Sequence, residues 1–131
     1  MSNKEYRLMK EEKKFDLEDR LIDFAVRVIT VSESLPKSKA GKHIAGQLIR
    51  SGTSPAANYG EAQSAESRAD FIHKMKISLK ELRETLVWLK MIKRAKFIEP
   101  PSKLESLLDE NNQLTSIFVT SLKTAKEKKT S

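Results

Sequence analysis

The sequence predicts an all-α fold, in which four helices pack as an up-down antiparallel four-helix bundle. Four segments carry apolar residues at alternating steps of three and four, which places these residues on one face of each helix. No segment shows the alternation of apolar and polar residues that is typical of a strand. The chain has 131 residues, of which 38% are hydrophobic, and this suffices for one core. Short connections make helices that follow each other antiparallel.

The first helix is predicted over residues 16–34. Asp16 is a suitable N-cap residue, because its carboxylate can accept hydrogen bonds from the first free amides. Pro36 ends the segment, since the residue before a proline is disfavoured in helical geometry. The apolar face consists of Leu17, Leu21, Phe24, Val28, Val31 and Leu35.

The second segment, residues 38–63, has a less regular composition. It contains all four glycines of the chain and also Pro55, and both residue types oppose a helix interior. Apolar residues nevertheless keep a helical repeat on both sides of Pro55. The pattern predicts either a kinked second helix or two short helices that meet near residues 51–54. Small residues such as Gly46 and Gly52 suggest that another helix approaches closely.

The third helix is predicted over residues 68–94 and the fourth over residues 102–126. The third has the most regular apolar face, and two prolines mark the entry to the fourth. Each begins at a serine that an acidic residue follows three positions later, which is the pattern of a capping box. The two pairs are Ser67 with Asp70 and Ser102 with Glu105.

The bundle domain is predicted over residues 15–126, between a flexible charged N-terminal arm (1–14) and a basic C-terminal tail (127–131). The chain has no cysteine, which excludes disulfides and thiolate metal sites. No apolar run approaches the roughly 20 residues of a membrane span, and the start lacks the apolar stretch of a secretion signal. We therefore expect a cytoplasmic protein that does not contact membranes.

The sequence shows no recognisable catalytic or cofactor motif. It has no phosphate loop, no dinucleotide fingerprint and no nucleophile motif. Its two histidines, His43 and His73, lack the partners that a zinc site of three or four ligands needs. We therefore expect no cofactor, no metal and no enzymatic activity.

Positive charge is concentrated in the third helix. The chain carries a net charge of +7, and residues 68–96 hold nine basic and three acidic residues, a net +6. A regular row of cations on a rigid helix can contact phosphates without reading bases, although the same row could also serve only to keep the surface solvated. The candidate nucleic-acid-binding residues are Lys76, Lys80, Arg83, Lys90, Lys93 and Arg94.

A polar stripe follows one face of the second segment. Its members are spaced four, four and three residues apart, and in an antiparallel hairpin they lie opposite the middle of the third helix. Arg50 would then lie near Glu81 or Glu84, and Asn58 near Lys74 or Ser78. An Arg–Glu pair between the two helices would fix their register. The alternative is a ligand or catalytic site at the same place. The predicted polar network consists of Arg50, Ser54, Asn58, Glu61, Ser78 and Glu81.

Several apolar residues lie away from the main apolar faces of the helices. They could widen the core, or they could form an interface between subunits, and the second possibility favours a homo-oligomer. These residues are Ile22, Ile29, Val87, Trp88, Ile92 and Ile117.

The middle of the chain resembles one known family. The similar stretches are QLIRSGTSPAANYGEA over residues 47–62, AESRADFIHK over residues 65–74 and SLKELRETLVWL over residues 78–89. The family is that of the bacterial four-helix-bundle proteins which include those encoded in 23S ribosomal RNA intervening sequences. The resemblance covers about residues 15–120. Its pattern matches Arg50-Ser51, Asn58, Glu61, Asp70-Phe71-Ile72 and Glu81.

This resemblance implies a four-helix bundle that assembles into a ring, typically a homopentamer. Relatives include the accessory protein of diversity-generating retroelements, which is basic and pentameric and binds nucleic acid and a reverse transcriptase. A pentamer of chains that each carry +7 would have a charge of +35. Such a ring would bind polyanions through many weak contacts with a steep salt dependence.

The first function hypothesis is therefore a non-enzymatic, oligomeric helical bundle that binds RNA or DNA through its basic face. The resemblance alone implies a role in the biology of rRNA intervening sequences or of retroelements. The alternative is a protein-interaction scaffold, for example a ring that docks a reverse transcriptase, without affinity of its own for nucleic acid. This alternative predicts an exposed apolar patch around Trp88 and Ile92.

Overall fold

The structure, a computed structural model, describes the backbone of residues 2–130 and the side chains of residues 2–5 and 16–127. Over residues 2–130 the chain forms helices and turns, with no strand. The all-α prediction is therefore confirmed. The elements are α1 (Asn3–Ser34), α2 (Lys39–Gln63), α3 (Arg68–Arg94), the 3-10 turn η1 (Pro101–Leu104) and α4 (Glu105–Thr130).

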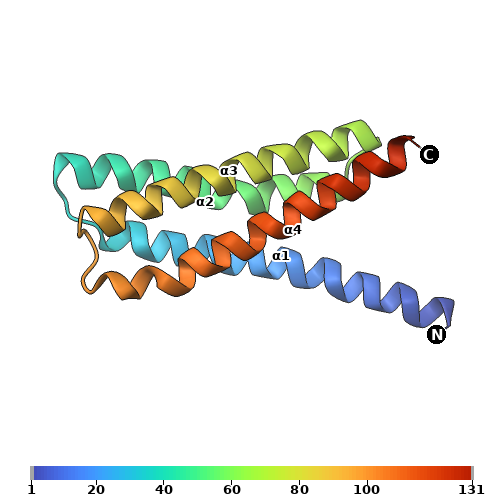
Figure 1. Ribbon diagram of the computed structural model, residues 1–131, viewed down its shortest axis with the longest axis horizontal. Coiled ribbons are helices and arrows are strands. Elements are labelled where there is room, and N and C mark those ends of the chain that lie inside the picture. The colour runs from blue at the N-terminus through green and yellow to red at the C-terminus, as the bar shows by residue number, and fades with distance from the viewer. Residues whose placement is uncertain (1, 131) are drawn as a thin grey trace.

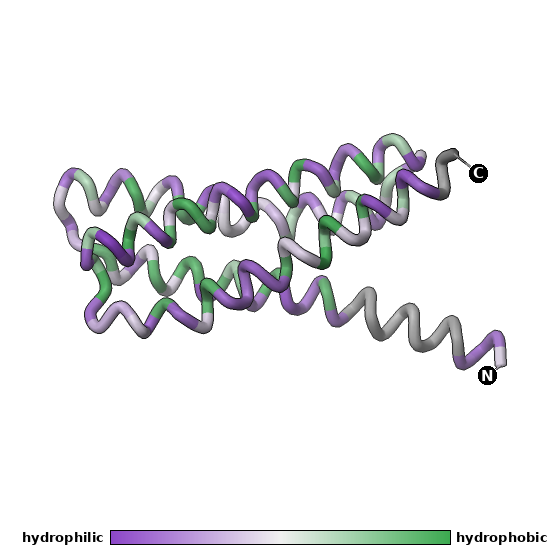
Figure 2. Tube along the Cα trace, viewed as in Figure 1, coloured by the Kyte–Doolittle hydropathy of each residue, from purple (hydrophilic) through white to green (hydrophobic). Residues whose placement is uncertain are grey.

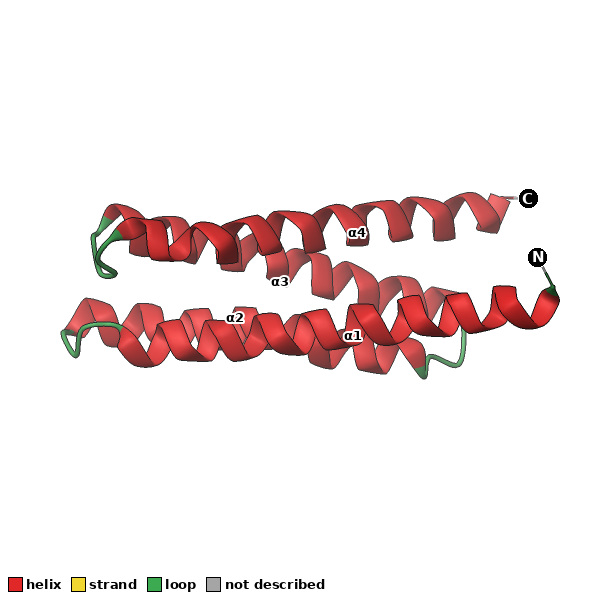
Figure 3. Cartoon of the chain, turned by 90° about the horizontal axis from the view of Figure 1, so that it is seen from below, coloured by secondary structure: helices red, strands yellow, loops and turns green. Residues whose placement is uncertain are grey.

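The four long helices pack as an antiparallel bundle. Successive helices run in opposite directions, so α1 begins at the end of the bundle where α4 ends (Figure 1). The connections lie at the two ends of the bundle (Figure 3). Each helix packs against the next one in sequence, and the contact between α1 and α4 is the smallest. The predicted up-down arrangement is confirmed.

Two predicted helix starts differ from the structure. Helix α1 begins at Asn3 rather than at Asp16, because Ser2 and Glu5 form a capping box there. The predicted arm thus contributes backbone to α1, while the side chains of residues 6–14 lie outside the described part of the chain. The predicted capping box of Ser102 and Glu105 does not form, since Ser102 lies in η1, which has no side-chain cap. The predicted cap of α3 is present.

Helix α2 is a single helix from Lys39 to Gln63, with Pro55 inside it. The alternative of two short helices is therefore wrong. Gly52 explains how tightly α1 and α2 pack, because a Cβ added there would lie 2.5 Å from a methyl of Val28. Gly46, the other small residue considered, has no neighbouring atom within 4 Å of such a Cβ. Of these two glycines, only Gly52 is needed for the close approach of α1 and α2.

The core runs along the axis of the bundle and draws on all four helices. Hydrophobic residues recur along each helix, as the green segments of Figure 2 show. The predicted apolar faces of α1, α3 and α4 supply most of the buried side chains. The largest fully buried residues include Phe24, Leu48, Leu82, Leu114 and Phe118.

Polar contacts join helices α1 and α4 along their shared edge. Arg20 forms an ion pair with Glu110 at 2.6 Å, and the Arg27 guanidinium donates to the Ser106 hydroxyl at 2.5 Å. The hydrogen bond from Arg20 to Glu110 raises the pKa of the guanidinium above its ordinary value. These contacts are partly exposed, so they orient the two helices more than they stabilise them.

The surplus apolar residues fall into two groups. Ile92 is fully buried, and Trp88 and Ile117 are half-buried, so these three extend the core. The others remain on the surface of the single chain. On α1 the exposed residues form a row in which Asp19 and Glu33 flank Ile22, Val26 and Ile29 at spacings of three and four.

Candidate nucleic-acid interface

The predicted basic residues of α3 lie on the side of the helix that faces away from the core. Lys76, Lys80, Arg83, Lys90 and Arg94 are all exposed, and we call these five residues the basic row. At 100° per residue they fall within an arc of roughly 80°. The buried Leu82 and Leu89 lie on the opposite side of the helix. From Lys76 to Arg94 the row advances 18 helical steps, or roughly 27 Å, which is about the length of eight base pairs.

Two of the three acidic residues of α3 lie on the flank that faces α2, away from the basic row. Glu81 accepts a hydrogen bond from Arg50 at 3.0 Å, and Glu84 forms an ion pair with the same guanidinium. Glu84 also accepts from the indole of Trp88 at 3.0 Å. These carboxylates are thus engaged with groups between α2 and α3, and they leave the outward arc of α3 positively charged.

The Arg50 contacts are those that an antiparallel register between α2 and α3 gives. The side chain of Arg50 is 49% exposed and that of Glu81 is 14% exposed, so the pair is not a buried one. About three turns further along α2, Glu61 forms an ion pair with Lys74 at 2.7 Å. The hydrogen bond from Lys74 to Glu61 raises the pKa of the ammonium group.

The other members of the predicted polar network are arranged differently from the expectation. Asn58 does not reach α3, and its amide donates within α2 to the backbone and hydroxyl oxygens of Ser54, at 3.0 and 2.9 Å. The hydroxyl of Ser78 donates across to the Pro55 carbonyl at 3.3 Å. The network is therefore a series of separate contacts along the α2–α3 interface.

A cleft lies between the C-terminal end of α3 and the start of α4, next to one end of the basic row. Its volume is about 550 Å³, and we call it the basic cleft. Its apolar side chains are half-buried, and most of its basic side chains are exposed. The apolar residues are Leu86, Pro101 and Leu108, the basic ones are Lys90, Lys93, Arg94 and Lys96, and Glu105 and Asn112 complete the lining.

Lys93 differs from the other predicted binding residues. It is half-buried, and its ammonium group forms an ion pair with Glu105 at 2.5 Å. This pair neutralises the carboxylate that lines the basic cleft. Lys93 therefore serves as a link between α3 and α4 more than as a free cation.

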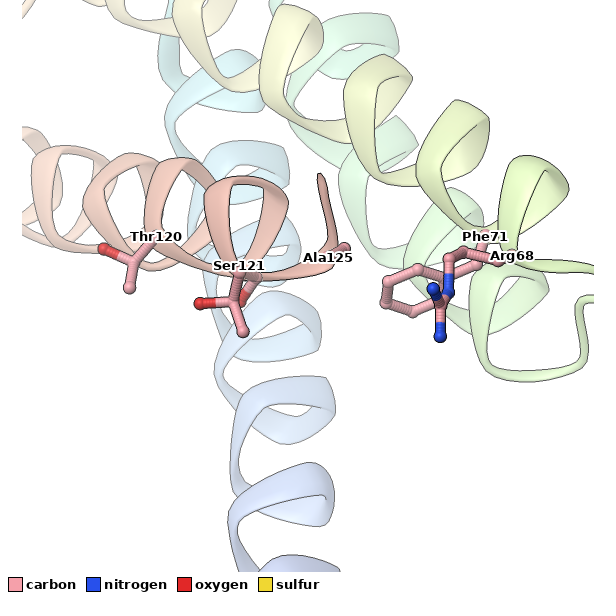
Figure 4. Close-up of a pocket in the computed structure, with 6 residues that line it drawn as sticks. Arg68, Phe71, Thr120, Ser121 and Ala125 are labelled. Carbon is pink, nitrogen blue, oxygen red and sulfur yellow. The ribbon is translucent and has the colours of Figure 1, made fainter. Parts of the chain in front are cut away.

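A second cleft, of about 480 Å³, lies between the start of α3 and the end of α4. Thr120 and Ser121 form one side of it, and Phe71 and Arg68 form the other (Figure 4). Among the described residues that line it, Arg68 is the one cation. Its described lining therefore carries fewer cations than that of the basic cleft.

Comparison with known proteins places the chain in a family. The profile of the 23S rRNA-intervening sequence proteins matches residues 13–120, which is most of the chain. The chain belongs to this family. No curated protein matches it in sequence.

A solved structure supports both the fold and the family assignment. It is the crystal structure of a protein of unknown function from the S23 ribosomal protein family of Bacteroides thetaiotaomicron, and it superimposes on this chain with a TM-score of 0.77. The two sequences are 34% identical, over 85% of this chain and 98% of the other.

The residues on which the family resemblance was recognised lie mostly between α2 and α3. Ser51 is buried, and its hydroxyl accepts from Thr85 at 2.9 Å. Ile72 is buried in the core, whereas Asp70 lies in the first turn of α3. The polar residues of the pattern that contact the other helix hold α2 and α3 together. The family pattern therefore has a structural role.

Six of the nine described residues that line the basic cleft are not among the predicted binding residues. Lys96 lies just beyond the predicted end of the third helix, and Leu86 lies within that helix. Pro101 belongs to η1, and Glu105, Leu108 and Asn112 belong to α4. A helical repeat alone does not show which faces of α3 and α4 meet. The charge of Lys96, directly after a helix that ends in Lys93 and Arg94, was the available signal.

Among the described residues, no three His, Cys, Asp or Glu side chains come together as they would around a metal ion. In the same part of the chain, no helix combines the length and apolar character that a membrane crossing requires.

Proposed function

We propose that this protein is a non-enzymatic, cytoplasmic RNA- or DNA-binding protein that acts as a homo-oligomer. Nucleic acid binds along the basic row and contacts it through phosphates. The role in rRNA intervening-sequence or retroelement biology follows from the family resemblance and forms part of the proposal.

The observation that carries this proposal is the arrangement of charge on α3. Five cations lie in one exposed line, while Glu81 and Glu84 of the same helix are engaged with Arg50 on the other flank. A line of cations on a rigid helix backbone is already placed to contact successive phosphates, and these contacts release counterions that are bound to the nucleic acid. A surface that served only for solubility would gain nothing from this separation of charges.

The proposal includes a ring-shaped homo-oligomer, as in the pentameric relatives. The exposed row on α1 supports this part, because Ile22, Val26 and Ile29 form an apolar line on the surface of the single chain. Val26 is 55% exposed. A neighbouring subunit that covers this line would remove apolar surface from water.

The test is a charge reversal within the basic row. We expect Lys80→Glu with Arg83→Glu to weaken binding to duplex and single-stranded RNA alike by at least tenfold, measured by fluorescence anisotropy. The dependence of log K on log salt should become shallower by about two, because two phosphate contacts are lost. Lys39→Glu with Lys42→Glu, on the exposed surface of α2, makes the same change in charge elsewhere. Equal binding by the α3 variant and the wild type would refute the proposal.

The second candidate is a scaffold that docks a reverse transcriptase or another protein. The exposed Val87 and Met91 favour it, because they place apolar surface within and beside the basic row. The apolar patch predicted around Trp88 and Ile92 is instead centred on Val87 and Met91, because Ile92 is in the core. Light scattering behind a sizing column, with and without structured RNA at low and physiological salt, separates the two candidates. A scaffold would keep its mass when RNA is added.

A further inference from the structure

The basic cleft differs in shape from the rest of the basic row. Lys76, Lys80 and Arg83 project from the convex surface of one helix, where they can meet only the outside of a polyanion. Lys90 and Arg94 instead border a hollow of about 550 Å³, which is within the size range of small-molecule sites. The two halves of the row therefore offer different chemistry.

The cleft combines apolar surface with excess positive charge. Leu86, Pro101 and Leu108 are half-buried within it, and Lys90, Arg94 and Lys96 are exposed around them. The one carboxylate in the lining, that of Glu105, is already paired with Lys93. No ion pair joins Lys90, Arg94 or Lys96 to an acidic residue within the described side chains.

Lys96 adds a backbone argument for a role in this cleft. Its φ is +58°, a left-handed conformation in which glycine is favoured over any residue with a Cβ. The amide of Lys96 donates to the Lys93 carbonyl at 3.2 Å, and that of Phe97 donates to the Ile92 carbonyl at 3.1 Å. These two bonds form a Schellman motif, whose left-handed position is usually a glycine. The chain has a lysine where glycine would fit with less strain.

We propose that the basic cleft binds an unpaired nucleotide, so that the protein prefers single-stranded over duplex nucleic acid. This inference rests on the function proposed above and specifies its substrate. A nucleobase has flat apolar faces that fit against Leu86 and Leu108, and its polar edge can bond to the amide of Asn112. The phosphates on either side lie within the field of the surrounding cations. In a duplex the bases are stacked and paired, so they cannot enter the cleft.

The experiment compares three polyanions by fluorescence anisotropy or competition. They are an unstructured 12-nucleotide RNA, a 12-base-pair RNA duplex and linear inorganic polyphosphate, which has no bases. We expect the single strand to bind about tenfold more tightly than the duplex or the polyphosphate at physiological salt. A single strand that carries 4-thiouridine should crosslink under ultraviolet light to peptides that contain Leu86 or Leu108.

Variants of the lining locate the preference. Leu108→Ala removes part of the apolar surface, and it should lower single-strand affinity several-fold while leaving duplex affinity unchanged. Asn112→Glu adds a carboxylate at an exposed position where folding is not at risk, and Thr124→Glu is its control three turns further along α4. We expect only the change at Asn112 to reduce single-strand binding.

Lys96→Gly separates a binding role of Lys96 from a purely structural one, because the substitution is expected to change stability and binding in opposite directions. It should raise the urea midpoint of unfolding, because it relieves the left-handed backbone, and at the same time weaken single-strand binding several-fold. Lys123→Gln removes one charge at the opposite end of the bundle and should do neither. A rise in stability with unchanged binding would overturn the role of Lys96.

The outcomes distinguish this inference from the proposed function. Equal affinity for the three polyanions, unchanged by Leu108→Ala, overturns the inference and leaves the proposed function standing. No binding to any of them overturns both. A change in oligomeric mass in Leu108→Ala, with RNA binding unchanged, would assign the cleft to a protein contact and overturn the inference.

Discussion

The close packing of α1 against α2 predicts opposite effects for the same substitution at two glycines of one helix. Gly52→Ala would place a methyl 2.5, 2.8 and 3.0 Å from three side-chain carbons of Val28, whereas Gly46→Ala would meet no atom within 4 Å. Both changes favour the helix by about 1 kcal/mol, because alanine is the better helix former. Only the first forces atoms together.

The expected size of the clash follows from what can move. Carbon atoms in contact prefer separations of about 3.5–4.0 Å, so the two helices would have to part by about 1 Å. Val28 cannot turn aside, because it is fully buried and a β-branched residue in a helix has one preferred rotamer. Overpacking of this kind costs about 1–3 kcal/mol. After the gain in helix propensity, we expect Gly52→Ala to destabilise by up to about 2 kcal/mol and Gly46→Ala to stabilise by up to about 1 kcal/mol.

Urea unfolding followed by circular dichroism at one fixed protein concentration measures both changes. The combination with Val28→Ala tests the cause, because it removes the methyls that clash. In that background we expect Gly52→Ala to be neutral or stabilising, a coupling of about 2 kcal/mol. If Gly52→Ala is as stable as Gly46→Ala in the wild-type background, the close approach of α1 and α2 is wrong.

Three further predictions concern polar groups. Arg50→Ala should lower the free energy of unfolding in urea by about 1 kcal/mol, rather than by the several kcal/mol expected for a buried pair, because Arg50 is half exposed. A loss above about 3 kcal/mol would show that Arg50 is buried in the assembly. Asn111→Leu should stabilise the protein by about 1 kcal/mol, because the buried amide nitrogen of Asn111 has no hydrogen-bond partner among the described residues. A lower urea midpoint of unfolding in this variant would show that the amide has a partner. Burial raises the pKa of Tyr59, so the stability that its neutral phenol contributes is full below the unfolded value of about 10 and is lost as the pH rises through the folded value. The thermal unfolding temperature should therefore fall more steeply between pH 8 and 11 for the wild type than for Tyr59→Phe. Parallel curves for the two proteins would contradict the raised pKa of Tyr59.

The fold could be predicted from the sequence because each helix buries one face. The repeats of three and four residues identified most of the core, and the antiparallel register was enough to place Arg50 beside Glu81 and Glu84. Helix ends were predicted less well. A capping box at Ser2 competes with the N-cap expected at Asp16, and local signals do not say which one the chain uses.

The candidate interface divides in the same way. The sequence by itself determined the basic row, because positions on one helix face follow from the period of a single helix. Only the tertiary structure decided that Ile92 is core, that Lys93 is tied to Glu105 and that Lys96 borders a cleft with Leu108. These facts depend on the rotation of α3 against α4 and on the left-handed turn that ends α3. The period within one helix carries no information about the rotation of the next helix. The basic row could therefore be predicted from the sequence, and the basic cleft could not.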